Sequence, residues 1–180
     1  GKTFGKDTNL TKEHAQACPC CQPSIVPLED ETLLIAYRSS VRSVKEIQLL
    51  RFGAHQKAGS TVQVSNNNWF FSGCPTSGPS LSVSSDQKRV YMAWISENML
   101  YSAMSLNGGK SFEKQQKIGR GRYHEIEAAN NEEPVFIWEW DKKTWVQNGK
   151  ESPYLPEKRV VFPGKFISSP GGMYTFFQKS

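Results

Sequence analysis

The chain has 180 residues with a formal net charge of +5, of which 37% are hydrophobic and 12% aromatic. This length allows one domain with a buried core, and the frequent aromatic residues argue against disorder. No apolar run is long enough for a transmembrane helix, and residues 1–10 lack the apolar region of a signal peptide. The basic residues are scattered, which argues against nucleic acid as a partner but permits an anionic ligand.

An internal repeat is the strongest pattern in the sequence. C-P-C-C-Q-P-S-I at residues 18–25 aligns with C-P-T-S-G-P-S-L at 74–81, and L-L-I-A-Y at 33–37 aligns with V-Y-M-A-W at 90–94. G-K-T-F at 1–4 also matches G-K-S-F at 109–112, so the chain is expected to open inside a repeat unit. The predicted units are about 18–70, 74–118 and 122–163, with partial units at 1–12 and 164–180.

Each unit contains short runs of β-branched and aromatic residues bounded by Gly, Asn, Asp and Ser. The predicted strands are 23–26, 32–37, 45–52 and 61–64 in the first unit, and 80–83, 89–95, 99–105 and 113–118 in the second. Near the C-terminus, 165–169 and 173–177 predict a hairpin around two glycines.

Four short strands per unit are typical of a β-propeller blade. We therefore expect an all-β propeller of four-stranded antiparallel blades, with about three blades and flanking strands that belong to a larger or assembled ring. A β-sandwich is the competing arrangement. Because three blades leave two sheet edges open, we expect a strand after Phe4 to pair with a C-terminal strand such as 173–177, or the chain to self-associate through these edges.

One turn carries a family resemblance. The segment S-L-N-G-G-K-S-F resembles the Asp-box, or BNR repeat, hairpin of sialidases, although Asn107 stands where that family usually has Asp. In such a turn glycines adopt positive φ, small polar side chains hydrogen-bond the backbone, and an aromatic residue packs between sheets. The residues that match the motif are Ser105, Asn107, Gly109, Ser111 and Phe112.

The C-P-C-C element and the later G-C-P-T-S-G-P element also resemble a bacterial subgroup of exo-α-sialidase-like proteins. This resemblance implies a secreted or periplasmic propeller that is directed at carbohydrate, either as a glycoside hydrolase or as a glycan-binding module. It covers residues 1–118 well and is weak after His124. Because function resides in sites rather than folds, the chemistry has to be sought in individual residues.

A sialidase needs arginines for the substrate carboxylate, a Tyr nucleophile activated by Glu, and an Asp acid/base. The early F/Y-R-I-P element of the family is missing. The candidate ligands for the carboxylate are Arg38, which lies at a strand end, and Arg120 and Arg122. The alternative for each is a solvated surface arginine that binds no ligand. Trp94 is a candidate for stacking on a sugar, although periodic aromatic residues more often pack in the core. No residue can be assigned as the nucleophile.

The four cysteines form the second candidate site. The repeat places Cys18 and Cys74 at equivalent positions, with Cys20 and Cys21 beside the first. His124 precedes the corresponding strand of the third unit, so all five side chains could converge. Three interpretations remain open: one or two disulfides, such as Cys18 to Cys74; buried free thiols; or a redox or metal site for Cu(I) or Zn(II).

The sequence therefore leaves three functional hypotheses. The first is a glycan-directed sialidase-like propeller, with or without hydrolysis. The second is a thiol, metal or redox site on the same scaffold. The third is a propeller without catalytic activity that binds other proteins.

Overall fold

The computed structural model describes residues 3, 6–7, 9–12, 14–53, 59–128, 133–156, 164–169 and 172–177. These residues form antiparallel β-sheets joined by turns and loops, and they contain no helix. The predicted all-β class is therefore confirmed. No helix in the described part of the chain is long and apolar enough to cross a membrane.

The first sheet runs in the order β1-β2-β3-β4, and a short fifth strand pairs with the beginning of β3. The second sheet has four strands in the order β6-β7-β8-β9. Their bounds are β1 (Ser24–Pro27), β2 (Thr32–Val41), β3 (Val44–Gly53), β4 (Ser60–Gln63), β5 (Trp69–Phe70), β6 (Ser80–Val83), β7 (Val90–Ser96), β8 (Met99–Ser105) and β9 (Gln116–Arg120).

The third sheet has three described strands in the order β10-β11-β12, and a separate hairpin follows it. The bounds are β10 (His124–Glu127), β11 (Val135–Trp140), β12 (Lys143–Asn148), β13 (Gly164–Ser169) and β14 (Gly172–Phe177). The predicted C-terminal hairpin is confirmed, because β13 pairs with β14. The strand that we expect after Phe4 would begin at residue 5, which lies outside the described residues.

The prediction of four strands per unit is met by the second sheet, whereas the first sheet has five strands and the third has three described strands. In the first sheet, β3 has ten residues, whereas β4 has four and pairs with only part of it. The unpaired beginning of β3 offers free backbone groups, and β5 satisfies some of them. In the third sheet, three strands are described, and residues 157–163 lie outside the described part.

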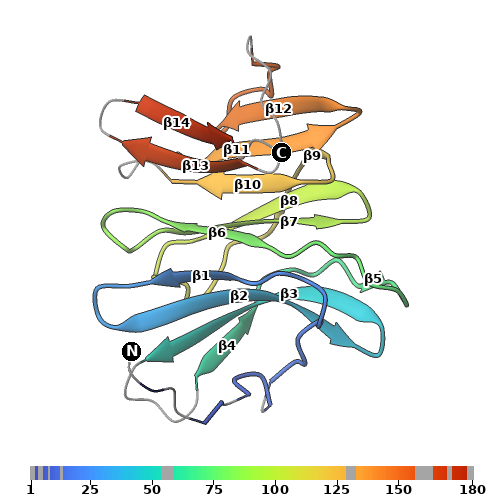
Figure 1. Cartoon of the computed structure of the whole chain (residues 1–180), viewed down its shortest axis with the longest axis vertical. Coiled ribbons are helices and arrows are strands. Elements are labelled where there is room, and N and C mark those ends of the chain that lie inside the picture. The colour runs from blue at the N-terminus through green and yellow to red at the C-terminus, as the bar shows by residue number, and fades with distance from the viewer. Residues whose placement is uncertain are drawn as a thin grey trace.

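The sheets lie face to face in a stack, with β1, β6 and β10 side by side along one edge (Figure 1). Strand β7 shows how the stack is built, because all seven of its residues are buried. Since side chains alternate across a strand, one set faces the first sheet and the other faces the third. Val90, Met92 and Trp94 belong to the first core, whereas Tyr91, Ala93 and Ile95 belong to the second.

The register confirms the repeat. Ser24 pairs with Ala36 in the first sheet, and Ser80 pairs with Ala93 in the second, as the alignment of the two C-P-x-x-x-P-S segments requires. A further repeated feature is a two-residue turn after the second strand in each of the first three sheets. Both residues of this turn have positive φ. These turns are Arg42 and Ser43, Glu97 and Asn98, and Asp141 and Lys142.

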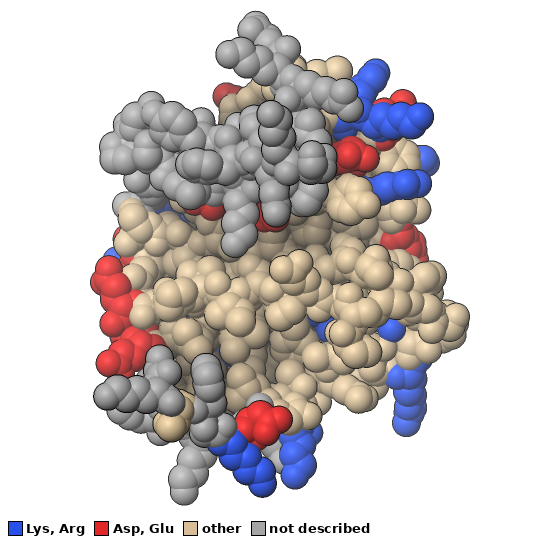
Figure 2. Space-filling model, viewed as in Figure 1, with Lys and Arg blue, Asp and Glu red and all other residues tan. Residues whose placement is uncertain are grey.

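Charged side chains are sparse on the face that β1 and β6 form. Figure 2 shows Lys and Arg, and also Asp and Glu, mostly around the margins of this face. The described residues on this face show no basic patch of the kind that follows a nucleic-acid backbone.

Candidate thiol and disulfide site

Two connecting segments bring the cysteines together at one end of the first sheet. The Cys18 amide donates a hydrogen bond of 2.8 Å to the carbonyl of Arg38, which holds the C-P-C-C turn against the end of β2. Cys74 lies in the connection between β5 and β6. This connection packs directly on the turn, because a Cβ atom at Gly78 would lie 1.7 Å from the Gln22 carbonyl oxygen. Only glycine allows this close backbone approach.

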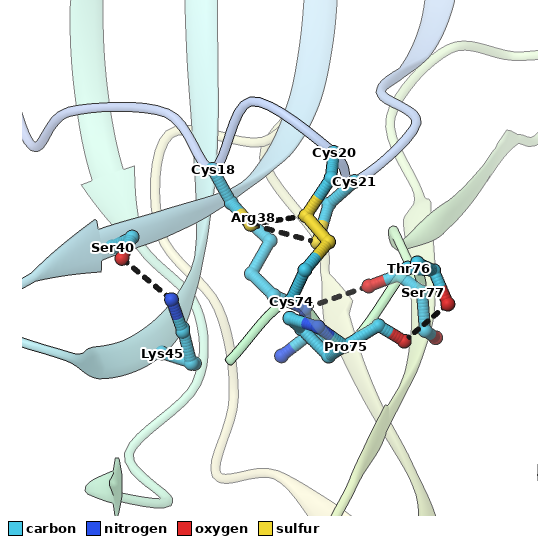
Figure 3. The surroundings of a disulfide bond; sticks show 10 residues. All are labelled: Cys18, Cys20, Cys21, Arg38, Ser40, Lys45, Cys74, Pro75, Thr76 and Ser77. Carbon is cyan, nitrogen blue, oxygen red and sulfur yellow. Dashed lines mark hydrogen bonds between the residues drawn. A yellow bond between two sulfur atoms is a disulfide. The ribbon is translucent and has the colours of Figure 1, made fainter. Parts of the chain in front are cut away.

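Four sulfur atoms meet at this contact (Figure 3). Cys20 and Cys74 form a disulfide, with their Cα atoms 6.3 Å apart. Cys18 and Cys21 are free thiols and are buried. The Cys18 sulfur lies 3.5 Å from that of Cys20 and 3.0 Å from that of Cys21.

The structure therefore brings together all four cysteines, but with a different pairing from the one that the repeat indicates. Cys74 is bonded to Cys20 and not to its repeat equivalent Cys18. The reason is local. Cys18 is fixed along β2 by its backbone and is 5% exposed, whereas Cys20 lies on the exposed side of the turn.

Three of the sulfurs have the spacing of a metal site. The Sγ atoms of Cys18, Cys20 and Cys74 all lie within 4.8 Å of one another. The predicted fifth member, His124, is not part of this group, because its Nε2 atom lies 2.9 Å from the Ala93 carbonyl oxygen. The imidazole therefore takes part in the contact between the second and third sheets.

Burial determines the protonation of two groups here. Burial raises the pKa of the Cys21 thiol to about 11, with a further increase from the hydrogen bond to Cys18, so Cys21 is protonated at neutral pH. Burial also lowers the pKa of His124 to about 4, and the nearby charge of Arg38 acts in the same direction. The His124 ring is therefore neutral at pH 7.

Arg38 lies beneath the sulfurs and is fully buried. Its Nε atom donates to the Ser77 carbonyl at 2.7 Å, and its Nη2 atom donates to the Ile95 carbonyl at 2.6 Å. The Trp69 ring covers the guanidinium at 5.2 Å. The third nitrogen, Nη1, is buried and has no hydrogen-bond partner among the described residues. One arginine thus joins β2, the segment that follows Cys74, and β7.

The charge of this arginine faces the thiols. Burial lowers its pKa below the ordinary value of an arginine, and Cys21, Cys18 and Glu46 oppose that shift. Glu46 is already engaged by the following loop, because its carboxylate accepts hydrogen bonds from the Ser65 hydroxyl and from the Asn68 amide. Among the charged groups that oppose the lowering of the Arg38 pKa, Cys21 and Cys18 contribute more than Glu46.

Sequence reasoning did not identify Trp69 or Glu46 as neighbours of Arg38. In the sequence, Trp69 stands out only as the first of three consecutive aromatic residues, W-F-F at 69–71. Glu46 did give a signal in the sequence, because it is a charged residue inside a predicted strand. Charged residues are rarely buried unless they have partners, so a buried Glu46 would need hydrogen-bond donors nearby. Its partners come from residues 65–68, and their approach depends on the path of the chain after β4.

The other ligand candidates lie in different surroundings. Trp94 is fully buried between the first and second sheets, and its Nε1 donates to the Asn67 side chain, so its ring belongs to the core and not to a sugar platform. Arg120 lies over the Trp140 ring at 5.6 Å. Arg122 is exposed at the beginning of the third sheet. The three arginines therefore have separate environments.

The Asp-box-like segment forms a hydrogen-bonded turn between β8 and β9. The Ser105 hydroxyl donates to Asn107 Oδ1 at 2.9 Å and accepts from the Gly109 amide at 2.9 Å. Asn107 Oδ1 also accepts from the Ser111 amide at 3.0 Å. Phe112 packs against the core between the first and second sheets. The segment thus connects a tight turn to the core between two sheets.

Comparison of the chain with family models, curated proteins and solved structures gives no match.

Proposed function

We propose that the reduced protein binds a soft metal cation, Cu(I) in particular, through the thiolates of Cys18, Cys20 and Cys74. The observation that carries this proposal is the convergence of their three sulfur atoms within 4.8 Å. Thiolates are soft ligands and select Cu(I) and Zn(II) among biological metals.

The buried arginine supports an anionic centre at this position. A Cu(I) ion bound by two or three thiolates carries a net negative charge. Arg38 is fully buried, and its Nη1 atom has no hydrogen-bond partner in the described part of the chain. A buried cation is stabilised when an anion lies beside it, so the guanidinium would offset the charge of the metal–thiolate group.

The donor set favours Cu(I) over Zn(II). Structural zinc sites are tetrahedral and need four protein ligands. Among the described residues, three sulfurs lie within 4.8 Å of one another, and the fourth, that of Cys21, lies 3.0 Å from Cys18 but outside this group. The predicted nitrogen ligand, His124, contacts the Ala93 carbonyl. Cu(I) is satisfied by two or three thiolates, so the three cysteines suffice for it.

The state of the disulfide decides whether this site is available. In the structure Cys20 is bonded to Cys74, so two of the three ligands are oxidised. Cation binding therefore requires both sulfurs to be released as thiolates. We expect affinity for the cation to depend on the redox state of this pair.

An anaerobic competition titration against a chromophoric Cu(I) chelator tests the proposal. Reduced wild-type protein is expected to bind one Cu(I) per chain. Cys74→Ser removes a ligand and should weaken binding about 100-fold or more, whereas Cys21→Ser, outside the three-ligand set, should retain the wild-type affinity. Absence of Cu(I) uptake by the reduced wild type, or equal uptake by Cys74→Ser, would rule the proposal out, provided that circular dichroism shows folded variants.

We also infer a propeller ring for the stacked sheets. The equivalent registers, the repeated two-residue turns and the Asp-box-like turn between β8 and β9 support blades related by a regular rotation. Superposition of the first two sheets in an experimental structure should give one rotation that also maps the second sheet on the third. Two unrelated rotations would contradict the ring.

One exposed pair supports a glycan-directed role as a second candidate function. Arg122 and Tyr123 are adjacent and exposed, and Tyr123 is 61% exposed. Gly121, just before them, packs against Ile95, whose carbonyl binds Arg38. A guanidinium beside an aromatic ring can bind an acidic sugar. A titration with free sialic acid, followed by fluorescence and compared with Arg122→Met, should show binding that the variant loses; equal signals would exclude this pair.

A further inference from the structure

The four sulfurs are arranged as a buried dithiol beside an exposed disulfide. Cys18 and Cys21 are 5% and 8% exposed, whereas Cys20 and Cys74 are exposed. Cys18 contacts both sides of this arrangement, at 3.5 Å from Cys20 and 3.0 Å from Cys21. The Cys18 sulfur therefore belongs to the buried pair and also lies next to the disulfide.

We propose that the Cys18–Cys21 dithiol is an internal reductant for the Cys20–Cys74 disulfide, so that a soft cation can be captured without an external reductant. This proposal rests on the proposed function, since it explains how the oxidised form could release two of the three proposed ligands, Cys20 and Cys74, while Cys18 enters the new disulfide. The juxtaposition of a thiol pair and a disulfide in one sulfur cluster carries it.

The reaction consists of two thiol–disulfide exchanges. In the first, the Cys18 thiolate attacks the Cys20 sulfur, a bond forms between these two atoms, and Cys74 leaves as a thiolate with the electron pair of the broken bond. In the second, the Cys21 thiolate attacks the Cys18 sulfur, and Cys20 leaves as a thiolate. The protons of the two original thiols pass to solvent or to the two released sulfurs. One disulfide is present before and after, so no oxidant or reductant is consumed.

The chain geometry suits the second exchange as well as the first. Cys18 and Cys21 bracket a tight turn in which the Cys21 amide donates to the Cys18 carbonyl at 3.3 Å. Their sulfurs are the closest pair of unbonded cysteines in the described residues, at 3.0 Å. A disulfide between them would replace two buried thiols with an uncharged bridge in the same space.

The direction of the exchange would depend on the cation. The structure holds the bond between Cys20 and Cys74. After exchange, Cys20 and Cys74 are exposed thiolates, and a soft cation that binds only this form shifts the equilibrium towards it by mass action. The two released thiolates are soft ligands of the kind that Cu(I) prefers, although they are one fewer than the fully reduced site offers. Cation binding and disulfide position would thus be coupled.

Silver(I) tests the exchange, because it is a soft cation like Cu(I) but does not exchange electrons with thiols. Oxidised wild-type protein is mixed anaerobically with one equivalent of Ag(I) without reductant, quenched in acid and alkylated. The disulfide is then located by mass spectrometry of peptides. We expect the Cys20–Cys74 linkage to decline and a Cys18–Cys21 linkage to replace it. A linkage that stays at Cys20–Cys74 while Ag(I) is bound would overturn the proposal.

Cys21→Ser provides the matched control, because it retains the three proposed ligands but cannot complete the second exchange. Without reductant it should bind Ag(I) about tenfold or more weakly than the wild type. After reduction with a phosphine and removal of that reagent, both proteins should bind Ag(I) equally. If the wild type binds only after reduction, the exchange is excluded and the metal site remains. If neither reduced protein binds, the proposed metal site itself is excluded.

Discussion

At the scale of single residues, Arg38 connects three segments that are distant in the sequence. Its donors reach the Ser77 and Ile95 carbonyls, and its guanidinium lies under Trp69. Hydrogen bonds from a charged donor contribute more to stability than neutral ones, and removal of the donor leaves buried carbonyls unsatisfied. Arg38 is therefore expected to stabilise the contact between the first two sheets, in addition to its proposed electrostatic role.

Replacement of this arginine tests its structural role. Arg38→Met keeps much of the side-chain volume but removes both hydrogen bonds, and we expect the free energy of unfolding to fall by about 2–4 kcal/mol. Urea denaturation measures the change. Arg122→Met, at an exposed position, is the control and should shift stability by no more than about 0.5 kcal/mol. Equal effects of the two substitutions would show that the buried contacts of Arg38 contribute little.

His124 makes stability dependent on pH. Its pKa is about 4 in the fold, below the ordinary 6.5 of an exposed histidine, mainly because of burial. Between these values the unfolded chain binds more protons than the folded one, so stability is full above pH 6.5 and falls as the pH drops towards 4. The full loss amounts to about 3 kcal/mol.

Denaturation of wild type and His124→Gln across this pH range checks the expectation. The variant should be less stable at pH 7 but should lose most of the slope between pH 6.5 and 4. Asp30 and Asp86 do not titrate in the same range. Hydrogen bonds with Thr32 and Ser84 lower the pKa values of these carboxyl groups below the ordinary 3.8, so the stability that they contribute is lost only at lower pH. An unchanged slope in the variant would assign the pH dependence to other groups.

At the scale of elements, turns define the repeat more sharply than the strands do. The three sheets share a two-residue turn with positive φ at both positions, and none of these turns contains glycine. Such turns match the right-handed twist of antiparallel strands, which explains their use despite the strain on side chains. Their sequences, R-S, E-N and D-K, share no residue type, so the pattern emerges only from backbone geometry.

The turn at residues 105–112 offers a test of element geometry. Gly109 has a φ of +80°, and a Cβ atom there would lie 2.7 Å from a methyl carbon of Leu49. Gly109→Ala should therefore lower the free energy of unfolding by about 2–3 kcal/mol, through backbone strain and steric conflict together.

Gly108→Ala separates these two causes. Gly108 has a similar φ of +65°, but the nearest atom to a Cβ there is 3.5 Å away. Its substitution should produce only the strain of the positive φ, about 1 kcal/mol. Thermal or urea denaturation of the two variants gives the comparison. If both lose the same stability, contact with the first sheet plays no part in positioning the turn.

At the scale of the whole molecule, one covalent bond joins the first two sheets. Cys20 precedes β1 and Cys74 precedes β6, and the disulfide between them spans 54 residues of sequence. A crosslink over such a loop restricts the unfolded chain and so raises the stability of the fold. The same bond occupies two of the proposed metal ligands, so stability and cation binding are linked.

Reduction should therefore lower the free energy of unfolding of the metal-free protein by about 2–4 kcal/mol. Urea denaturation with and without reductant measures this difference. Cys74→Ser should match the reduced wild type and should not respond to reductant. A wild type whose transition is the same in both conditions would indicate that the disulfide does not constrain the unfolded chain.

Much of the fold could be predicted from local patterns in the sequence. The strands of the first two sheets lie within a few residues of their predicted ranges, because short runs of β-branched and aromatic residues between turn-forming residues determine where strands begin and end. The aligned C-P-x-x-x-P-S segments also predicted which strands are equivalent, and the registers at Ser24 and Ser80 confirm it. The fifth strand was not predicted, since its partner is the free end of β3.

For the candidate site, the sequence by itself determined which groups are present and indicated that Cys18, Cys20, Cys21, Cys74 and His124 could converge, since equivalent positions in adjacent repeats come together. Only the tertiary structure decided that Cys74 pairs with Cys20, that His124 lies outside the sulfur group, and that Arg38 is buried beneath it. The physical reason is that repeat position specifies where a backbone segment lies to within one strand spacing. Disulfide pairing and burial depend on differences of a few ångströms, which the packing of one connecting segment on another determines.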